Sequence, residues 1–503
     1  MTAARQSRWF QFRLRTLLAA VTLAVIPLSW LGVELEQSRR QHAAIARIQE
    51  MGGEIEFEVH EGANWWRKQV HTWFGRAVRF VCLRNVQVSD LSPVTGLEDL
   101  RWLILTNTGV TDLSSITKLR ELNRLEIINT QVSNLSSVAE LERLEHLELS
   151  NETMLSRSPM AFADVKDLSA LVKLQRLEVL VIRNVPVGDV SQLSSLQNLE
   201  TLNLERTDVS DLSFLVEFKR LRYLDISSTQ VSDLSPLAQV STLETLDISH
   251  TPVNDLSPLA ALTNLHSLVL NGTQVKDLSA ISRLINLREI HLSHTKVESL
   301  WPLAGATSLE KLTIHDTLIQ DVSPLAKLVS LKGKLNLDNT RVSDLSPLAD
   351  LKNLYELSLN YTGVNDLSPL TSLKALKDLR FTGTQVNDLT PLSQLPNLTW
   401  VKFGKTSVTD LRPLASLTKL ETLAIYETSV HDLTPLRALS SLRHLYLSED
   451  ADQNAMVIVV SVSEDSEYTG EVEGMRIRGD QIQQLEKALP NCRVFWRRNT
   501  AEE

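Results

Sequence analysis

The chain has 503 residues, of which 43% are hydrophobic and 22% charged, a balance that is typical of a folded protein and excludes an intrinsically disordered one. Its formal net charge of −10 disfavours nucleic acid as a partner, because phosphate binding requires a basic surface. The two cysteines, Cys82 and Cys492, stand at opposite ends of the chain and cannot by themselves form a disulfide framework or a zinc knuckle.

The N-terminus combines a basic head with an apolar run. Residues 1–16 include four arginines, and residues 17–33 are apolar apart from a threonine, a proline and a serine. This run reaches the short end of the range for a transmembrane helix, and the arginines favour a cytoplasmic N-terminus with the rest of the chain exported. A buried helix and a cleaved signal peptide, which would make the protein secreted, are alternatives, although no clear small-residue cleavage site follows.

Two short segments separate this run from the rest of the chain. Residues 34–53 have helical character and end in a pair of glycines, and we expect a helical stalk there. Residues 54–77 contain an alternating strand and an aromatic-rich stretch. The first unit of a solenoid must cover an exposed core, so this stretch is interpreted as an N-terminal cap, with a binding patch as the alternative. Its large aromatic residues are Trp65, Trp66, Trp73 and Phe74.

Residues 78–448 repeat a unit of 22 residues. The pattern Val-x-Asp-Leu at residues 253–256 returns at the same spacing in both directions. Its aspartate column has sixteen positions, which are 22 residues apart except for steps of 33 after Asn134 and 23 after Asp321. Self-similarity at a fixed period of about 20 to 50 residues is the sequence signature of a solenoid.

Each unit combines a short strand with a short helical turn. Leu246 and Ile248 alternate with polar residues, so we expect these two side chains to point inward from a strand. Ser257 followed by Pro258 predicts the N-cap and the first residue of the turn. The recurring threonine at the position of Thr251 is expected to bond backbone groups of the turn that would otherwise be buried and unpaired.

The unit L-x-x-L-x-L-x-x-T-x-V-x-D-L-S-P-L resembles the 22-residue leucine-rich repeat of bacterial internalin-type proteins, with Thr where that family usually has Asn. Together with the strand count and the apolar N-terminal run, the resemblance predicts an α/β leucine-rich-repeat solenoid. Its curved parallel sheet would have about 17 strands, with short helical or 3-10 turns on the convex side and one N-terminal transmembrane helix. The resemblance implies surface recognition and no particular ligand, because repeat arrays serve many partners.

An insertion of eleven residues interrupts the repeat between Leu149 and Asp167. It contains Met154, Met160 and Phe162, and flexible apolar side chains of this kind suit an adaptable contact. Loops that break a regular scaffold often carry function, so the insertion is a second candidate site. The alternative is a loop that folds back over the side of the array.

The outward strand positions are the best candidates for binding, because the repeat pattern does not dictate which residues they hold. In the C-terminal quarter they are richest in aromatic and basic residues, the types that dominate binding hot spots. An ordinary surface with scattered aromatics is the alternative. The candidate ligand site on the concave face comprises Arg380, Trp400, Lys402, Tyr426, His444 and Tyr446.

Metal and catalytic patterns find little support in the sequence. His291 and His315 lie on adjacent outward strands, with His294 and Asp316 in the following turns, but no HExxH or CxxC spacing accompanies them, and we interpret the group as a polar surface. The repeats themselves supply many Ser, Asp and His residues, so a catalytic triad chosen among them carries no information. We expect no enzymatic activity, no metal and no cofactor.

Residues 449–503 leave the repeat pattern and are interpreted as a C-terminal cap. Within this cap we expect a strand at 456–462, a solvated acidic loop at 464–473, an amphipathic helix at 481–489 and a last strand at 493–496. The whole chain is then a monomeric, membrane-anchored and non-enzymatic recognition module, which binds a protein or a cell-envelope polymer on its concave face. The alternative is a structural spacer of the envelope without a dedicated ligand.

Overall fold

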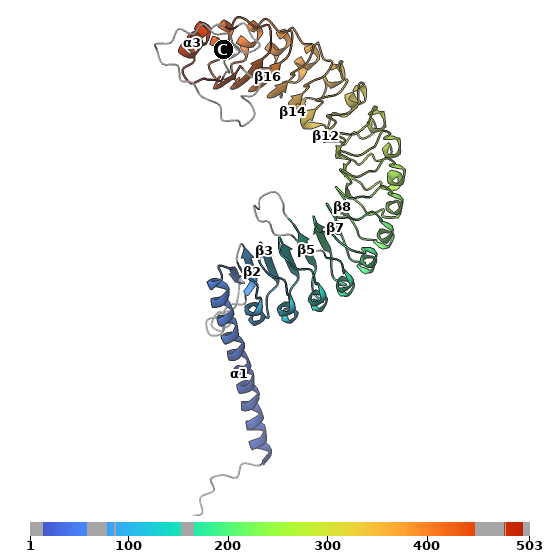
Figure 1. Cartoon of the computed structure of the whole chain (residues 1–503), viewed down its shortest axis with the longest axis vertical. Coiled ribbons are helices and arrows are strands. Elements are labelled where there is room, and N and C mark those ends of the chain that lie inside the picture. Colours follow the sequence, from blue (N-terminus) through green and yellow to red (C-terminus); the bar gives the residue numbers. More distant parts are fainter. Residues whose placement is uncertain are drawn as a thin grey trace, which may run out of the picture. The chain divides into compact units, whose positions relative to one another are not determined.

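The computed structural model describes residues 14–57, 78–84, 87–151, 165–447, 477 and 479–495. The chain divides into two compact units, unit 1 up to Leu199 and unit 2 from Glu200 onward. Within each unit, strands lie side by side along one side of the repeats and short 3-10 helices follow the opposite side (Figure 1).

A single helix, α1 (Leu14–Glu50), precedes the repeats and runs through the residues predicted as a membrane span and as a stalk. None of the helices that the structure describes is both long and apolar enough to cross a membrane. The helix ends before Gly52, whose φ of 74° is a left-handed conformation that commonly terminates helices. Near this end Ala44 and Ile48 are buried, because α1 packs against the first 3-10 helix of unit 1.

The described residues contain nineteen strands. In unit 1 the strands β2 to β6 are parallel, and β1 pairs with β2 in the antiparallel sense. In unit 2 the pairing from β7 to β19 is parallel throughout. Strands β2 to β18 correspond to the predicted array of about seventeen, and β1 and β19 add one strand at each end.

The strands of unit 1 are β1 (Glu54–Phe57), β2 (Val78–Arg84), β3 (Trp102–Thr106), β4 (Arg124–Ile128), β5 (His146–Ser150) and β6 (Val179–Arg183). Those of unit 2 are β7 (Thr201–Asn203), β8 (Tyr223–Asp225), β9 (Thr245–Asp247), β10 (Ser267–Val269), β11 (Glu289–His291), β12 (Lys311–Thr313), β13 (Lys332–Asn336), β14 (Asn353–Ser358), β15 (Asp378–Arg380), β16 (Trp400–Gly404), β17 (Thr422–Tyr426), β18 (His444–Tyr446) and β19 (Arg493–Phe495).

The helical turns of the repeats that the structure describes are of the 3-10 type. Unit 1 contains η1 (Ser92–Gly96), η2 (Ser114–Lys118), η3 (Ser136–Glu140), η4 (Ser169–Lys173) and η5 (Ser191–Ser195). Unit 2 contains η6 (Ser213–Glu217), η7 (Ser235–Gln239), η8 (Ser257–Ala261), η9 (Ser279–Ile281), η10 (Trp301–Leu303), η11 (Ser323–Lys327), η12 (Ser346–Leu348), η13 (Ser368–Ser372), η14 (Thr390–Gln394), η15 (Arg412–Ser416) and η16 (Thr434–Ala438).

The core follows the predicted alternation. Leu246 and Ile248 are 0% exposed, while Thr245 and Asp247 on the same strand are partly exposed. The position of Leu246 is leucine, isoleucine or valine on neighbouring strands, so the core is a stack of mainly aliphatic side chains with one layer per repeat. The inward assignment of Leu246 and Ile248 is therefore confirmed.

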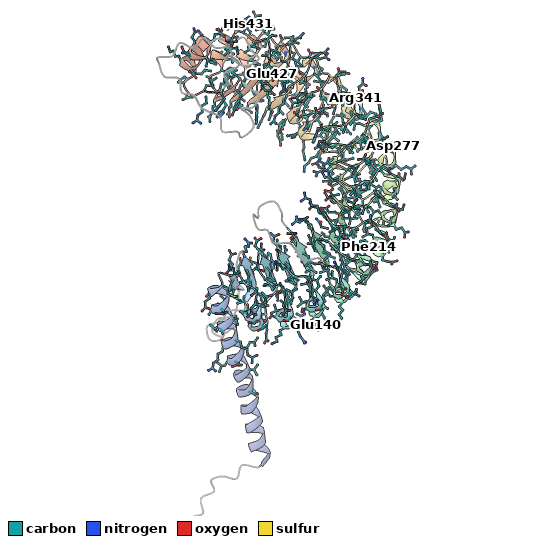
Figure 2. The ribbon with its side chains drawn as sticks, viewed as in Figure 1. Glu140, Phe214, Asp277, Arg341, Glu427 and His431 are labelled. Carbon is teal, nitrogen blue, oxygen red and sulfur yellow. The ribbon has the colours of Figure 1, made fainter. Side chains whose placement is uncertain are left out.

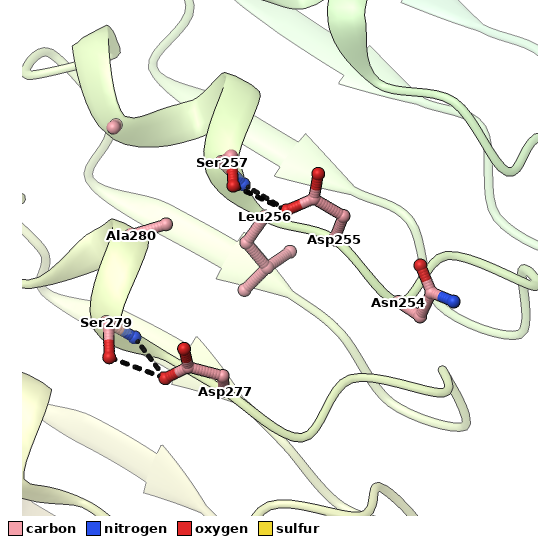
Figure 3. Close-up of a pocket in the computed structure, with 8 residues that line it drawn as sticks. Asn254, Asp255, Leu256, Ser257, Asp277, Ser279 and Ala280 are labelled. Carbon is pink, nitrogen blue, oxygen red and sulfur yellow. Dashed lines mark hydrogen bonds between the residues drawn. The ribbon is translucent and has the colours of Figure 1, made fainter.

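The start of each 3-10 turn differs from the prediction. The helix η8 begins at Ser257 itself, and no N-cap side chain bonds it. Instead Asp255 accepts hydrogen bonds from the backbone N–H of Ser257 at 2.8 Å and from its hydroxyl at 2.6 Å, as Figure 3 shows. The carboxylate is the stronger acceptor because it is charged, so the serine hydroxyl donates to it and is not itself the cap. Asp277, labelled in Figure 2, repeats the arrangement with Ser279.

Most threonines of the recurring column have the predicted structural role. Thr251 is 3% exposed, and its Oγ1 donates to the carbonyl oxygen of Ile248 at 2.6 Å. Buried backbone carbonyls require such partners at the end of a strand. The same bond to the residue three positions earlier recurs at Thr207, Thr229, Thr273, Thr295, Thr317, Thr340, Thr362 and Thr384.

The C-terminal end adds α3 (Gly479–Ala488) and β19, close to the predicted helix and last strand. Ile482 and Leu485 of α3 are buried, which covers apolar residues of the last repeats. The four aromatic residues predicted in the N-terminal cap lie outside the described residues, as do residues 1–13, the strand predicted at 456–462 and the acidic loop.

Candidate ligand-binding surface

The six residues predicted as a ligand site lie on four consecutive strands of unit 2, β15 to β18. Strand register aligns Asp378 with Trp400 and Arg380 with Lys402 across β15 and β16. The outward side chains of these strands, together with those of β19, are called the C-terminal strand face below. The alignment follows from the repeat, because residues 22 positions apart occupy the same place on neighbouring strands.

Arg380 and Trp400 form the centre of this face. The guanidinium carbon of Arg380 lies 4.5 Å from the centroid of the Trp400 ring, within the range of a cation–π contact. Asp378 also holds the guanidinium, with Nε–Oδ1 and Nη2–Oδ2 distances of 3.0 and 2.7 Å. Burial raises the pKa of the Asp378 carboxyl, and the bond to Arg380 opposes that rise. The arginine is therefore fixed in position before any ligand arrives.

The indole nitrogen of Trp400 is a hydrogen-bond donor without a partner among the described residues. The atom is buried, and its N–H makes no bond to the protein. A buried donor that stays unpaired lowers the stability of the fold by about 1–3 kcal/mol, so such donors are rare in folded proteins. An acceptor group of a ligand could reach this N–H only if a neighbouring side chain moved aside.

Tyr426 differs from the prediction of an exposed aromatic anchor. It is 3% exposed, and its hydroxyl lies 3.1 Å from Oγ1 of Thr382. The ring crosses the position of Gly404 on the intervening strand, where a Cβ atom would lie 2.3 Å from Cε2 of the tyrosine. Lys402 approaches the ring, with Nζ 5.8 Å from its centroid. Tyr426 is thus a support for the face and offers little surface for direct contact.

The last two strands carry a row of three rings. His444 and Tyr446 stack at 6.3 Å between centroids, and Tyr446 and Phe495 stack at 4.7 Å with an interplanar angle of 12°. All three side chains are partly exposed. Phe495 was missed from the sequence because it follows the non-repeating residues after 448. The predicted last strand was the available signal, since pairing it with β18 places Phe495 beside Tyr446.

A second cluster of the same composition lies in unit 1 and was not singled out from the sequence. Trp102 contacts Phe80 edge to face at 4.9 Å, and the guanidinium carbon of Arg124 lies 4.6 Å from the Trp102 centroid. Arg124 is held by Glu126, with an Nε–Oε1 distance of 2.6 Å. The available signal was an arginine one repeat after a tryptophan, the spacing that makes them neighbours on adjacent strands. As in Trp400, the Trp102 indole nitrogen is buried without a partner among the described residues.

The histidines considered as metal ligands occupy two places in unit 2. His291 bonds Glu289 at 2.7 Å and Thr313 at 3.0 Å. His294, His315 and Asp316 bring three possible ligand atoms within 4.8 Å of one another. The Asp316 carboxylate is already bonded there, to Nδ1 of His315 at 2.7 Å.

Two further features are the insertion and a hollow on the 3-10 side of unit 2. Met154, Met160 and Phe162 of the insertion lie outside the described residues. On the 3-10 side of unit 2, Asp255, Ser257, Asp277 and Ser279 help to line a hollow of about 410 Å³ between two successive repeats (Figure 3). Its carboxylates are used by the turn hydrogen bonds described above. The hollow is therefore a product of the repeat.

Several solved structures are similar to this chain. An internalin, inlF of Listeria monocytogenes, is 28% identical with a TM-score of 0.54, and the match covers 69% of this chain and 92% of that one. A leucine-rich repeat protein of Leptospira interrogans is 21% identical with a TM-score of 0.59, covering 81% and 93%. At that identity the likeness concerns the fold alone.

A third similar structure comes from a plant. The leucine-rich repeat ectodomain of the Arabidopsis thaliana receptor kinase GASSHO1/SCHENGEN3, in complex with CASPARIAN STRIP INTEGRITY FACTOR 2, is 18% identical with a TM-score of 0.57. This match covers 73% of the chain and 46% of the ectodomain, and it too concerns the fold alone. No curated protein matches the sequence significantly.

The family model for the leucine-rich repeat region matches residues 180–466, which is more than half of the 503 residues. The match begins in β6 and includes every strand of the C-terminal strand face except β19. The internalin resemblance of the repeat agrees with the inlF structure. Leucine-rich repeat proteins are generally recognition modules, and no catalytic family is indicated. The chain belongs to the leucine-rich repeat family.

Proposed function

We propose that the protein is a recognition module that binds a protein or a cell-envelope ligand on the C-terminal strand face of unit 2. The observation that carries this proposal is the pair Arg380–Trp400. A guanidinium held by Asp378 lies over an indole whose buried N–H has no partner among the described residues. Tryptophan and arginine are the residues most enriched in binding hot spots, and preorganised side chains lose little entropy on binding.

The neighbouring strands extend this centre into a surface. His444, Tyr446 and Phe495 add three partly exposed rings, and Lys402 adds a positive charge. The plant ectodomain, crystallised with a bound factor, supports ligand recognition by this fold but specifies no ligand for this chain. The ligand we expect has acceptor groups for the indole and the basic side chains, and apolar or planar groups for the rings.

The test compares two tryptophan variants of the full chain. Trp400→Ala removes the proposed hot spot, while Trp301→Ala removes a tryptophan that is 57% exposed on the 3-10 helix η10, on the other side of the same unit. Ligands captured from an envelope extract would be identified, purified and titrated against both variants. We expect Trp400→Ala to weaken binding at least tenfold and Trp301→Ala to leave it unchanged. Equal binding by both would refute the site and place the ligand elsewhere on the chain, and capture of no ligand at all would favour a spacer without a dedicated ligand.

We also propose that the N-terminal segment anchors the chain in a membrane, with a cytoplasmic N-terminus and an exported array. The support comes from the sequence, in which a head with four arginines precedes the apolar residues 17–33. Alkaline extraction of membranes from producing cells should leave the full chain in the pellet, and protease added outside should digest the repeats. Release of a chain that begins after residue 33 would show signal cleavage and a secreted protein instead.

A further inference from the structure

Two groups among the described residues bring three possible metal ligands together. They differ in how far their ligand atoms are already used. In the group of His294, His315 and Asp316, the aspartate carboxylate bonds His315 through Oδ2 and Asn339 through Oδ1. In the group of Glu126, His146 and Glu148, on β4 and β5 of unit 1, Nε2 of His146 is buried and has no partner among the described residues.

The donor atoms of this second group lie on adjacent strands. Register pairs Glu126 with Glu148 directly, and His146 stands two residues before Glu148 on the same side of β5. One ring nitrogen of His146 and one oxygen from each carboxylate lie within 4.8 Å of one another. A tetrahedral metal with bonds of about 2.0–2.2 Å holds its ligands roughly 3.4 Å apart, so modest rotations of the glutamate side chains would close the set.

Each carboxylate is oriented through only one of its oxygens. Oε1 of Glu126 accepts from Arg124 at 2.6 Å, and Oε1 of Glu148 accepts from Ser150 at 2.8 Å and from Arg183 at 3.3 Å. Hydrogen bonds to the second oxygen, Oε2, are absent among the described residues for both glutamates. Outer partners that hold a ligating carboxylate by its other oxygen are a general feature of metal sites.

We propose that Glu126, His146 and Glu148 form a binding site for a divalent transition-metal ion such as Zn²⁺ on the strand face of unit 1. One imidazole and two carboxylates suit zinc and its neighbours in the first transition row better than Ca²⁺, which prefers oxygen ligands throughout. The metal would supply the partner that the His146 nitrogen lacks. Three protein ligands would leave one coordination position open toward the outward side of the sheet, beside Arg124 and Trp102.

The site is separate from the surface proposed for recognition, because all its residues belong to unit 1. The two arginines offset the charges of the two carboxylates, so we expect a weaker site than a structural zinc centre of cysteines. A bound metal would nevertheless give this face a Lewis acid that a carboxylate or phosphate group of a ligand could reach.

The experiment is calorimetric titration of Zn²⁺ into the full chain after removal of metals with a chelator. The variants are His146→Asn and Glu148→Gln, the second being nearly isosteric in case the first disturbs folding. The matched control is the double variant His294→Ala/His315→Ala, which removes the other candidate group. Circular dichroism checks that all variants fold. Titration with Co²⁺ provides an optical signal for nitrogen and oxygen ligation.

We expect one equivalent of Zn²⁺ whose affinity falls at least tenfold in His146→Asn and in Glu148→Gln, and is unchanged in the control. A wild-type chain that binds no Zn²⁺ would overturn the proposal. The same holds if both single variants bind as tightly as the wild type, or if only the control loses the metal, which would assign it to His294 and His315.

Discussion

The hydroxyl of Tyr426 lies 3.1 Å from Oγ1 of Thr382, a residue two repeats earlier in the chain. The tyrosine ring spans the strand between them at Gly404, where this repeat has no side chain. Three neighbouring strands of unit 2 are thereby tied by one side chain on the outward side of the sheet. One end of this tie, Thr382, follows Arg380 by two residues, and the Tyr426 ring lies 5.8 Å from Nζ of Lys402, so the tie supports that part of the proposed binding surface.

Gly404→Ala should therefore destabilise unit 2. The added methyl group would meet the Tyr426 ring at 2.3 Å, so the ring must move and its bond to Thr382 must break. Overpacking of this kind costs about 1–3 kcal/mol. Urea denaturation followed by circular dichroism measures the loss. Gly363→Ala is the control, because its nearest atoms would be 3.4 Å away, and it should change the midpoint little. Equal midpoints for both variants would contradict the predicted packing.

Leu246→Asp should unfold the middle of unit 2. Leu246 is 0% exposed inside the aliphatic stack, and a carboxylate there has no partner and no water. An unpaired buried charge costs several kcal/mol, and in a stacked array the damage extends to both neighbouring repeats. Limited proteolysis should cut near β9, and the thermal midpoint should fall by several degrees. Thr245→Asp, on the outward side of the same strand, is the control and should melt like the wild type.

The repeat made most of the fold predictable. Side chains alternate with period two along a strand, so the buried positions of Leu246 and Ile248 follow from the pattern alone. The 22-residue step also places Arg380 and Trp400 on adjacent strands, and the structure puts them in contact. What the sequence could not show is how far a neighbour covers an outward residue. The burial of Tyr426 depends on a glycine one repeat away.

Two other differences between the predicted and the observed structure also arise from contacts that the repeat pattern does not specify. Phe495 follows a segment without repeats, so its register with β18 could not be counted from the period. At the 3-10 turns, serine before proline looks like an N-cap, but the aspartate two residues earlier is the better acceptor and takes the serine N–H. Local patterns predict the type of element well, while the side chain that bonds the first N–H groups of a turn depends on geometry in three dimensions.

Thr251→Val should weaken the fold without changing its shape. The valine fills nearly the same volume, but the carbonyl oxygen of Ile248 loses the hydrogen bond that Thr251 now donates at 2.6 Å. Loss of a buried hydrogen bond costs about 1–2 kcal/mol, which chemical denaturation can resolve. Thr263→Val provides the comparison, because Thr263 is exposed and its substitution should shift the midpoint much less. If the two variants have the same stability, the threonine column is not held by these bonds.

Stability should fall in acid, and the turn aspartates should contribute to that fall. The hydrogen bonds from Ser257 lower the pKa of Asp255 below its ordinary value of 3.8. A carboxyl with a lower pKa in the folded chain stabilises the fold above the unfolded value, and the contribution is lost as the pH falls through the folded pKa. Twelve aspartates of this column share the shift, so the urea midpoint of the wild type should drop between about pH 5 and pH 2.

Two asparagine variants separate this effect from general acid unfolding. Asp255→Asn should be less stable than the wild type at pH 7 and lose less on acidification, because its contribution is already gone. Asp225→Asn should instead lose more stability than the wild type on acidification. Burial raises the pKa of Asp225, so protonation in acid favours the folded wild type, and the variant lacks that gain. Urea midpoints of the wild type and both variants, taken at pH 7 and pH 3, measure these differences in stability. Parallel losses in all three proteins would mean that these hydrogen bonds do not control the acid response.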